Sequence, residues 1–387
     1  MPIINRAAEL AVDAAEWRRD FHQHPELLFD VHRTAGVVAR KLKEFGCDEV
    51  VTGIGRTGVV GVIKGRKATS GKVIGMRADM DALPISEITG AAHASTVPGK
   101  MHACGHDGHT AMLLGAARYL AETRNFDGTV VVIFQPAEEG GGGGKEMVDE
   151  GMMERFGVQE VYGMHNMPGM PVGAFAIRPG PIMAAADRFD IVIEGRGGHA
   201  AKPHETVDPV VIAAQIISAA QTIASRAADP IDSVVVSITR VDAGSAYNII
   251  PQSVLLQGTV RTLSAQMRDV AEKRLGEIAT GVAAAMGGAA RVDYSRGYPV
   301  TRNHADQTRF AVKVAQSVAG ENGVETALEP TMGAEDFSYM LEARPGAFIF
   351  IGNGDSAGLH HPAHDLNRAG VPVGMSPWGQ AAENPQA

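Results

Sequence analysis

The chain has 387 residues, of which 45% are hydrophobic and 20% are charged. At roughly 100–200 residues per domain, this length indicates two domains, or three at most, with a globular composition that can bury a large core. The net charge is −9 and no long run of Lys or Arg occurs, so we expect no nucleic-acid partner.

The N-terminal 35 residues are predicted to form a helix, with Leu10, Trp17 and Phe21 at loose helical spacing. This segment contains acidic residues, so it has the composition of neither a signal peptide nor a transit peptide. The longest apolar runs are far shorter than the roughly 18 residues of a membrane span. Two cysteines, Cys47 and Cys104, cannot form a disulfide framework. We therefore expect a soluble cytoplasmic protein with no membrane partner.

Apolar strands alternate with helices over the rest of the N-terminal half and again near the C-terminus. Continuous apolar strands that alternate with helices are typical of parallel sheets, so these parts predict a mainly parallel α/β fold. Strands are expected at 49–52, 59–64, 73–78, 129–134, 161–164 and 347–352, and helices at 36–46, about 107–124, about 145–154 and around 335–342.

The middle of the chain has a different order of elements. A strand at 189–194 is followed by a helix at 206–226, strands at 233–241 and 254–262, a helix at 264–285 and a strand at 290–296. This β-α-β-β-α-β order is that of the ferredoxin-like fold. It predicts an inserted α+β domain of residues 184–296 within a first domain of residues 1–183 and 297–387.

The densest group of potential metal ligands is the segment MHACGHDGHT, residues 101–110. It contains Cys104, His106, Asp107 and His109, and its two glycines allow the backbone to fold tightly around an ion. A structural loop is the alternative interpretation. However, thiolate and imidazole groups together are typical ligands of zinc or another borderline transition metal. The segment therefore predicts a metal site.

Further potential ligands follow the predicted strands directly. In open α/β sheets, functional groups gather at the carboxyl ends of the strands, so these side chains are expected to meet at one edge. They are Asp79 and Asp81 after the strand at 73–78, Glu138 and Glu139 after 129–134, His165 after 161–164, and His360 and His361 in the loop after 347–352.

The adjacent acids Glu138 and Glu139 can have different roles. A single acidic pair most often belongs to a solvated loop. Here the pair follows an apolar strand and precedes five glycines, at the place expected for a site. One carboxylate can ligate a metal while the other reaches bound water as a general base.

Three polar residues of the inserted domain are candidate substrate contacts. His199, in the segment GGHAAKPH, can stabilise an oxyanion, although the segment can also be a turn with incidental histidines. Asn248 and Arg261 are residue types that bind carboxylates, and Arg261 can do so through two hydrogen bonds.

Several segments together make a family recognisable. They extend from Arg18 to about His361 and read RRDFHQHPEL, GMRADMDALPI, MHACGHDGHTAMLLGAA, VIFQPAEEG, GMHN, GRGGHAAKPH, NIIP, GTVR and MGAEDFS. In these segments the chain resembles the aminoacylase–carboxypeptidase family of binuclear metallohydrolases, in the branch of hippurate hydrolase and the indoleacetyl-amino-acid hydrolases. The resemblance implies a metallopeptidase-like catalytic domain at 1–183 and 297–387 and a lid and dimerisation domain at 184–296.

The resemblance also implies roles for individual residues. Glu138 would be the general base, and Asp81 would support the metal site. His199, Asn248 and Arg261 would contact the substrate from the inserted domain. Two divalent metal ions, of Zn, Mn, Co or Ni, would be held by Cys104, His106, Glu139, His165 and His360.

From these observations we expect a metal-dependent amidohydrolase that cleaves N-acyl amino acids, such as hippurate, to a carboxylic acid and a free amino acid. We expect it to act as a homodimer. Two other classes stay open at this point. A cysteine-nucleophile amidase would use Cys104 with a nearby His, and a non-catalytic metal- or amino-acid-binding protein would need no general base.

One segment departs from the family's pattern. After His360 and His361 the branch usually has an aromatic residue and an acid that lead into an apolar C-terminal helix, whereas this chain reads PAHDLNR. We expect His360 to be the ligand because it follows Leu, as in the family. The prolines of the tail are expected to interrupt a long C-terminal helix; they are Pro372, Pro377 and Pro385.

Overall fold

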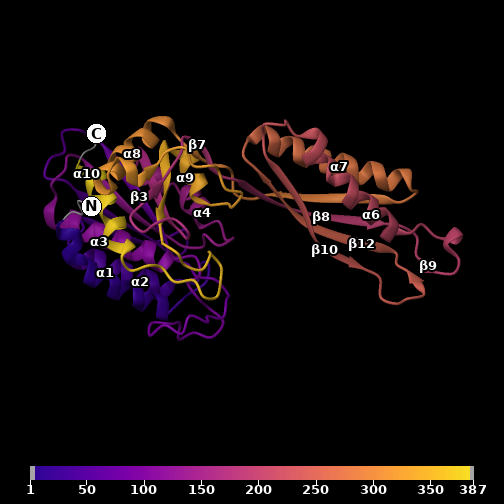
Figure 1. Cartoon of the computed structure of the whole chain (residues 1–387), viewed down its shortest axis with the longest axis horizontal. Helices are drawn as coiled ribbons and strands as arrows, with labels where there is room; N and C mark the ends of the chain where they lie inside the picture. The colour runs from indigo at the N-terminus through magenta and orange to yellow at the C-terminus, as the bar shows by residue number, and fades with distance from the viewer. Residues whose placement is uncertain (1–4, 384–387) are drawn as a thin grey trace. The chain divides into compact units, whose positions relative to one another are not determined.

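The computed structural model describes residues 5–383 and divides the chain into two compact units (Figure 1). Unit 1 comprises Met1–Ile182, Arg302–Glu329 and Asp336–Ala387, and unit 2 comprises Met183–Thr301 and Pro330–Glu335. The chain leaves unit 1 within strand β7 (Gly180–Met183) and returns within β14 (Thr301–Asn303). Unit 2 is therefore an insertion into the chain of unit 1.

Unit 1 is built on an eight-stranded sheet with the order β1-β2-β4-β3-β5-β16-β6-β15. The four central strands are parallel to one another, and an antiparallel hairpin extends one side. The predicted mainly parallel sheet is confirmed. The strands are β1 (Glu49–Ile54), β2 (Gly58–Lys64), β3 (Val73–Asp79), β4 (Thr129–Gln135), β5 (Glu160–Met167), β6 (Phe175–Ala176), β15 (Val324–Glu325) and β16 (Gly346–Gly352).

The helices of unit 1 bury their apolar faces against this sheet and against one another. Helix α3 is buried along almost its whole length, and both α1 and α10 pack against it. Leu113 and Leu114 of α3 share one core with Phe134 of β4 and Ile349 of β16. The helices are α1 (Asn5–Gln23), α2 (His32–Glu44), α3 (His106–Thr123), α4 (Gly143–Asp149), α5 (Met152–Arg155), α8 (Ala305–Ala319), α9 (Phe337–Ala343) and α10 (Gly370–Glu383), with a 3₁₀ turn at Glu321–Gly323.

Unit 2 has the predicted β-α-β-β-α-β order and one antiparallel sheet, β10-β12-β8-β13. Phe189, Ile191, Leu256 and Leu275 belong to its separate hydrophobic core. The elements are β8 (Ala185–Glu194), α6 (Pro209–Ala220), β10 (Val234–Ala243), β12 (Ser253–Thr262), α7 (Ala265–Ala285) and β13 (Ala289–Arg296), with the short pair β9 (Gly198–His199) and β11 (Ile249–Ile250) and a 3₁₀ turn at Pro203–Glu205.

One helical run in unit 2, Pro209–Ala227, is long and apolar enough to cross a membrane by length and composition alone. It consists of α6 and a π-helical turn at Ile223–Ala227. On its inner side, Ile212, Ile216 and Ile223 are buried in the core of unit 2. Packing on the sheet accounts for these three residues, whereas Val210 and Val211 of the same helix are exposed.

The predicted single N-terminal helix is wrong. Helix α1 ends at Gln23 and α2 begins only at His32. The residue before Pro25 is restricted away from helical backbone angles, and Leu27 then forms an isolated bridge with Ala82. The periodic apolar pattern thus continues across two helices that are separated by an extended turn.

The predicted interruption of the C-terminal helix is also wrong within the described residues, because α10 spans Gly370–Glu383 with Pro377 inside it. Pro372 lies in the first turn, where a backbone N–H has no partner within the helix. Pro377 removes one internal hydrogen bond, but the buried Trp378 and neighbouring residues hold the helix on the core. Pro385 lies outside the described residues.

Gly143, the first residue of α4, allows a close contact that supports the loop after β4. A Cβ atom at this position would lie 1.8 Å from the carbonyl oxygen of Pro136. Gly143→Ala should therefore displace the loop and destabilise unit 1 by about 1–3 kcal/mol. Gly36→Ala, in α2, is the control, because its Cβ would meet nothing within 4 Å. Thermal unfolding should show a lower Tm for Gly143→Ala alone, and equal Tm values would contradict this packing.

Candidate metal centre

The carboxyl ends of four parallel strands and the first turn of α3 bring potential ligands to one edge of the unit 1 sheet. Strand β3 leads to Asp79 and Asp81, and β4 leads through residues 136–137 to the two adjacent glutamates. His165 lies on β5, and the loop after β16 carries His360. These strands are neighbours in the sheet, so side chains far apart in sequence meet there.

Two overlapping groups of side chains have the composition of cation sites. The ligand atoms of Cys104, His106 and His165 lie within 4.8 Å of one another, as do those of Cys104, Glu139 and His360. The Cys104 sulfur lies 3.4 Å from His165 Nε2, and His360 Nε2 lies 3.4 Å from Glu139 Oε1. Cys104 belongs to both groups, so its thiolate would be available to the ions held by either group.

The two buried histidines are oriented by the backbone. His106 Nδ1 lies 2.8 Å from the carbonyl oxygen of Asp81, and His165 Nδ1 lies 2.7 Å from that of Asn166. A carbonyl oxygen can only accept, so each Nδ1 carries a proton, which leaves Nε2 as the nitrogen that would ligate a metal. Histidines that bind metals are commonly held in this way by the nitrogen that does not ligate.

Two buried polar atoms at this place have no hydrogen-bond partner. They are His106 Nε2 and Glu139 Oε1, and they lie 3.9 Å apart. Leaving a lone pair buried without a partner costs free energy, which a bound cation removes. Burial lowers the pKa of His165 and raises that of the Cys104 thiol to about 12, which favours the uncharged forms of these two groups. Against the effect of burial, the Asp79 carboxylate holds the pKa of His106 well above its usual range. The donors present therefore fit two divalent ions of the type that thiolate, imidazole and carboxylate ligands bind.

Asp81 holds the loop that carries both glutamates. Its two carboxylate oxygens accept hydrogen bonds from the backbone N–H groups of Glu138 and Glu139, at 3.0 and 3.1 Å. Ala137, just before them, has a φ of 56°, a backbone conformation that costs free energy in a residue with a side chain. The Glu138 side chain is buried, and its carboxylate lies within 4.8 Å of ligand atoms of His106 and Glu139.

Other histidines from the sequence motifs lie beside these groups. His109 Nδ1 lies 2.7 Å from Asp79, and its Nε2 lies 2.8 Å from the Asn166 side chain, so both ring nitrogens have protein partners. His361 Nδ1 accepts a hydrogen bond from the Ala363 N–H at 3.0 Å. Of the two adjacent histidines, only His360 lies in a ligand group with Cys104.

The structure places the three polar residues of unit 2 in two different locations within that unit. His199 pairs with Ile249 between β9 and β11, next to Asn248, at the end of the sheet where Ser253 pairs with Glu194. Arg261 lies near the other end of the sheet, where it pairs with Ala186. His199 and Asn248 are thus neighbours, and Arg261 is apart from them.

Two buried arginines were not identified as site residues from the sequence. Arg77, on β3, donates to Asp79 at 2.8 Å and to Gln135 at 2.9 Å, and it is almost fully buried. Its charge and that of His106 hold the pKa of Asp79 well below the usual range against the effect of burial. An Arg inside a buried apolar strand was the available signal. Arg18, in α1, is buried in the same way.

Comparison with known proteins identifies the family. The family model described as peptidase family M20/M25/M40 matches residues 75–384, so the chain belongs to this family of peptidases and related hydrolases. The predicted family is thus confirmed. The chain is 42% identical to the hippurate hydrolase of Campylobacter jejuni over 95% of both chains, and 40% identical to the N-acetylcysteine deacetylase of Bacillus subtilis over 94% of both.

A solved structure has the same fold. It is the Bacillus subtilis YXEP protein, described as a dinuclear metal binding peptidase from the M20 family. The two share 37% sequence identity and superpose with a TM-score of 0.85, over 97% of this chain and 98% of the other. The predicted metallopeptidase-like α/β fold is thereby confirmed.

Proposed function

We propose that this protein is a binuclear metal-dependent amidohydrolase that releases a free amino acid and a carboxylic acid from N-acyl amino acids. The observation that carries the proposal is the buried carboxylate of Glu138, which lies within 4.8 Å of ligand atoms of His106 and Glu139, where it can reach a water bound to the ions. A site that only stores metal needs ligands but no additional base. Glu138 supplies that base.

The metal ligands are Cys104, His106, Glu139, His165 and His360. Two divalent ions bound by them supply Lewis acidity, which polarises an amide carbonyl and makes water easier to deprotonate. Zn, Mn, Co and Ni all suit such a mixed set of thiolate, imidazole and carboxylate donors.

Glu138 then moves the proton. Its carboxylate takes a proton from the attacking water and afterwards delivers it to the nitrogen of the leaving amino acid. Asp81 fixes the backbone of Glu138 and Glu139 together, so that the ligand and the base keep a constant separation. Positioning of this kind lowers the barrier because no reorganisation is needed during the reaction.

The substrate class follows from the relatives and from the polar residues of unit 2. Hippurate and N-acetylcysteine, named in two relatives, are both N-acylated amino acids with a free carboxylate. Asn248 and Arg261 can bind that carboxylate, and His199 can stabilise the oxyanion that forms from the acyl carbonyl. The two named acyl groups differ in size, so we propose the shared class and no single substrate.

We also propose that the protein is a homodimer with shared sites. His199 and Asn248 lie at one end of the unit 2 sheet and Arg261 lies near the other, so one copy of unit 2 does not present all three at one point. A two-fold axis would bring the His199 end of one copy to the Arg261 end of the other.

The surface of unit 2 supports such pairing. Strand β10 is ten residues long and lies at an edge of its sheet, with Val235 and Val241 exposed. Val210 and Val211 of α6 are exposed as well. A long edge strand with exposed apolar side chains offers unpaired backbone groups to a second copy of the same strand.

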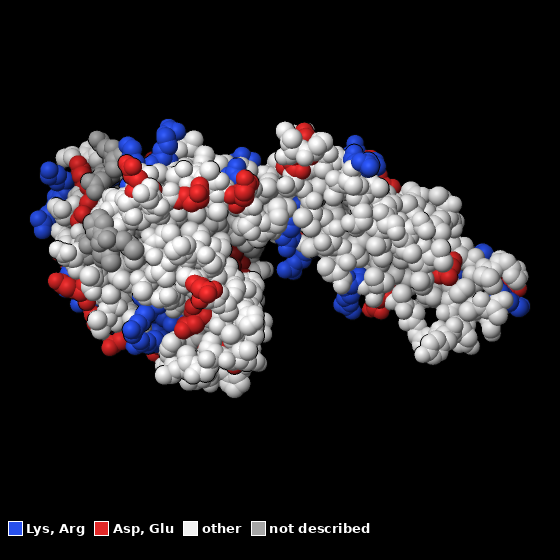
Figure 2. Space-filling model, in the orientation of Figure 1, with Lys and Arg blue, Asp and Glu red and all other residues white. Residues whose placement is uncertain are grey.

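We infer a cytoplasmic location and no nucleic-acid partner. Both cysteines, Cys47 and Cys104, are free thiols, as is usual in a reducing compartment. On the face shown in Figure 2, Lys and Arg side chains are scattered among Asp and Glu without a continuous basic surface. The net charge of −9 agrees with this distribution.

A cysteine-nucleophile amidase is the main alternative. A Cys nucleophile needs an accessible thiolate, whereas Cys104 is buried and its pKa is raised to about 12. Excess chelator would spare a cysteine amidase and should inactivate the enzyme that we propose. An acyl thioester trapped on Cys104 would favour the alternative.

Glu138→Gln should abolish most turnover while both ions stay bound, because the ligands remain and the proton acceptor is lost. The expected decrease in kcat is about 10²–10⁴-fold with hippurate as substrate. The matched control is Glu139→Gln, which should instead lower metal content. Metal analysis together with kcat separates the two roles, and a near-normal kcat for metal-loaded Glu138→Gln would remove this residue from the mechanism.

The shared-site dimer predicts complementation between two inactive variants. Glu138→Gln and His199→Ala chains are denatured, mixed in equal amounts and refolded together. With random pairing, half of the dimers are mixed and each has one intact site, which gives about a quarter of the wild-type activity. No recovered activity, with mixed dimers shown to have formed, would contradict the shared site.

A further inference from the structure

The guanidinium group of Arg18 connects two separate segments of unit 1. Its Nε donates to Asp107 Oδ2 at 2.6 Å, and its Nη2 donates to Asp365 Oδ1. The Arg18 side chain is only 4% exposed. Its charge keeps the pKa values of both acids below their usual range, against the opposing effect of burial. One buried cation therefore holds two carboxylates.

Each of these carboxylates belongs to a segment that carries a proposed metal ligand. Asp107 directly follows His106 in the first turn of α3. Asp365 follows His360 along the loop that leads to α10. Arg18 thus lies between the His106 segment and the His360 segment, although it comes from a third element, α1.

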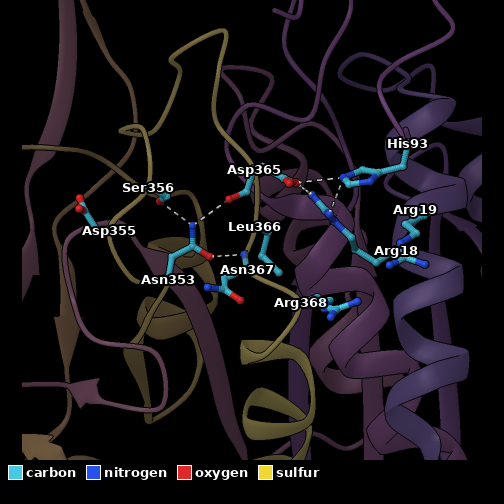
Figure 3. A pocket seen from close by; sticks show the side chains of 10 residues that line it. All are labelled: Arg18, Arg19, His93, Asn353, Asp355, Ser356, Asp365, Leu366, Asn367 and Arg368. Carbon is cyan, nitrogen blue, oxygen red and sulfur yellow. Dashed lines mark hydrogen bonds and ion pairs between the residues drawn. The ribbon is translucent and has the colours of Figure 1, made fainter. Parts of the chain in front are cut away.

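Each of the two carboxylates also has a histidine beside it. His22 Nδ1 lies 2.8 Å from Asp107 Oδ2. Figure 3 shows the other side, where His93 Nε2 lies 3.2 Å from Asp365 Oδ1 and 3.1 Å from Arg18 Nη1. Besides Arg18, Asp107 therefore has His22 as a fully buried partner. Among residues 5–383, the second side-chain partner of Asp365 is His93, which is only partly buried.

The two segments differ in how firmly packing holds them. Asp107 is fully buried, whereas the Asp365 side chain is 40% exposed, because it faces a pocket of about 300 Å³ (Figure 3). His360 is also about half exposed, and its φ of 62° is unfavourable for a residue with a side chain. The direction of the His360 side chain therefore depends on anchors beyond the residue itself.

This segment is anchored at several points: Leu366 is buried in the core of unit 1, and the Pro362 carbonyl accepts from the Ile88 N–H at 2.9 Å. The His360 N–H donates to the Ala103 carbonyl at 2.8 Å, and Asn353 Nδ2 donates to the Asp365 carbonyl at 3.1 Å. The Asp365 side chain adds the ion pair with Arg18. Burial of His364 and Leu366 holds the backbone on both sides of Asp365, and the ion pair with Arg18 sets the direction of the partly exposed Asp365 side chain.

We propose that Arg18 and Asp365 are positioning residues for the ion held by Cys104, Glu139 and His360, and that they set its affinity without contacting it. The inference rests on the proposed metal-dependent function. Residues that orient metal ligands typically change metal affinity 10–100-fold when they are substituted. The ion held by Cys104, His106 and His165 depends less on this ion pair, because Asp107 keeps His22.

The test is stepwise metal binding to the full-length chain, measured by calorimetry with Mn²⁺ after the bound metal has been removed by a chelator. Wild-type protein should bind two ions. Asp365→Asn keeps the size of the side chain and removes its charge, and it should weaken one ion 10–100-fold while the other changes by less than about threefold. Stoichiometry at limiting free metal should then be one ion per chain.

Matched controls are available in the same pocket. Asp355→Asn and Arg19→Lys change residues that line the pocket and that have no ion pair recorded among the described residues, so both variants should bind metal like the wild type. Arg18→Lys should weaken the same ion as Asp365→Asn. Both variants disrupt the Arg18–Asp365 ion pair, so adding Asp365→Asn to Arg18→Lys should not weaken this ion further.

The outcomes separate the two proposals. If wild-type protein binds no metal at these residues, the proposed function fails. If it binds two ions and Asp365→Asn binds both with unchanged affinity, the positioning role fails. Equal weakening of both ions together with a lower Tm would show a purely structural role, and it would also overturn the inference.

Discussion

The carboxylate of Asp81 accepts two backbone hydrogen bonds, from Glu138 and Glu139, and the arrangement of the site depends on this pair of bonds. They join the end of β3 to the loop after β4, and they require a strained backbone at Ala137. The Asp81 carbonyl also fixes the ring of His106. One residue thus orients the proposed base and two of the proposed ligands.

Ion pairs of two buried arginines hold further loops of unit 1 in place. Arg77 pairs with Asp79 and with Asp336 of the segment before α9, and Asp336 in turn accepts from the Gly144 N–H. Arg18 likewise connects two segments, because it pairs with Asp107 beside His106 and with Asp365 in the loop that carries His360. A buried cation is stable only when its partners stay in place, so such ion pairs specify one arrangement of loops. The loops around the proposed ions can therefore be rigid although they have no regular secondary structure.

The sequence was most informative where chemistry is local or where strands end. The Cys104–His106 spacing and the acids that follow apolar strands indicated the ligand groups, because parallel strands bring their carboxyl ends to one edge. It was less informative about long-range ion pairs. Arg18, Asp107 and Asp365 are far apart in sequence, and nothing in the pattern of any one segment shows that they meet.

Two errors of secondary structure have clear physical causes. The turn before His32 was missed because the apolar spacing of α1 and α2 looks continuous, although Pro25 disfavours a helix at the preceding residue. Helix α10 is longer than the prolines predict, because burial of Trp378 and its neighbours outweighs the cost of Pro377. In the first case a local signal, Pro25, ends the helix, and in the second case tertiary packing outweighs local propensity.

The central claim is that the two ligand groups that share Cys104 would each hold a divalent ion. Anomalous diffraction from crystals grown with Zn²⁺, recorded at the zinc absorption edge, tests this claim directly. The account predicts two anomalous peaks per chain, each about 2.3 Å from Cys104 Sγ, one beside His106 and His165 and the other beside Glu139 and His360. A single peak, or two peaks of which neither contacts Cys104, would contradict it.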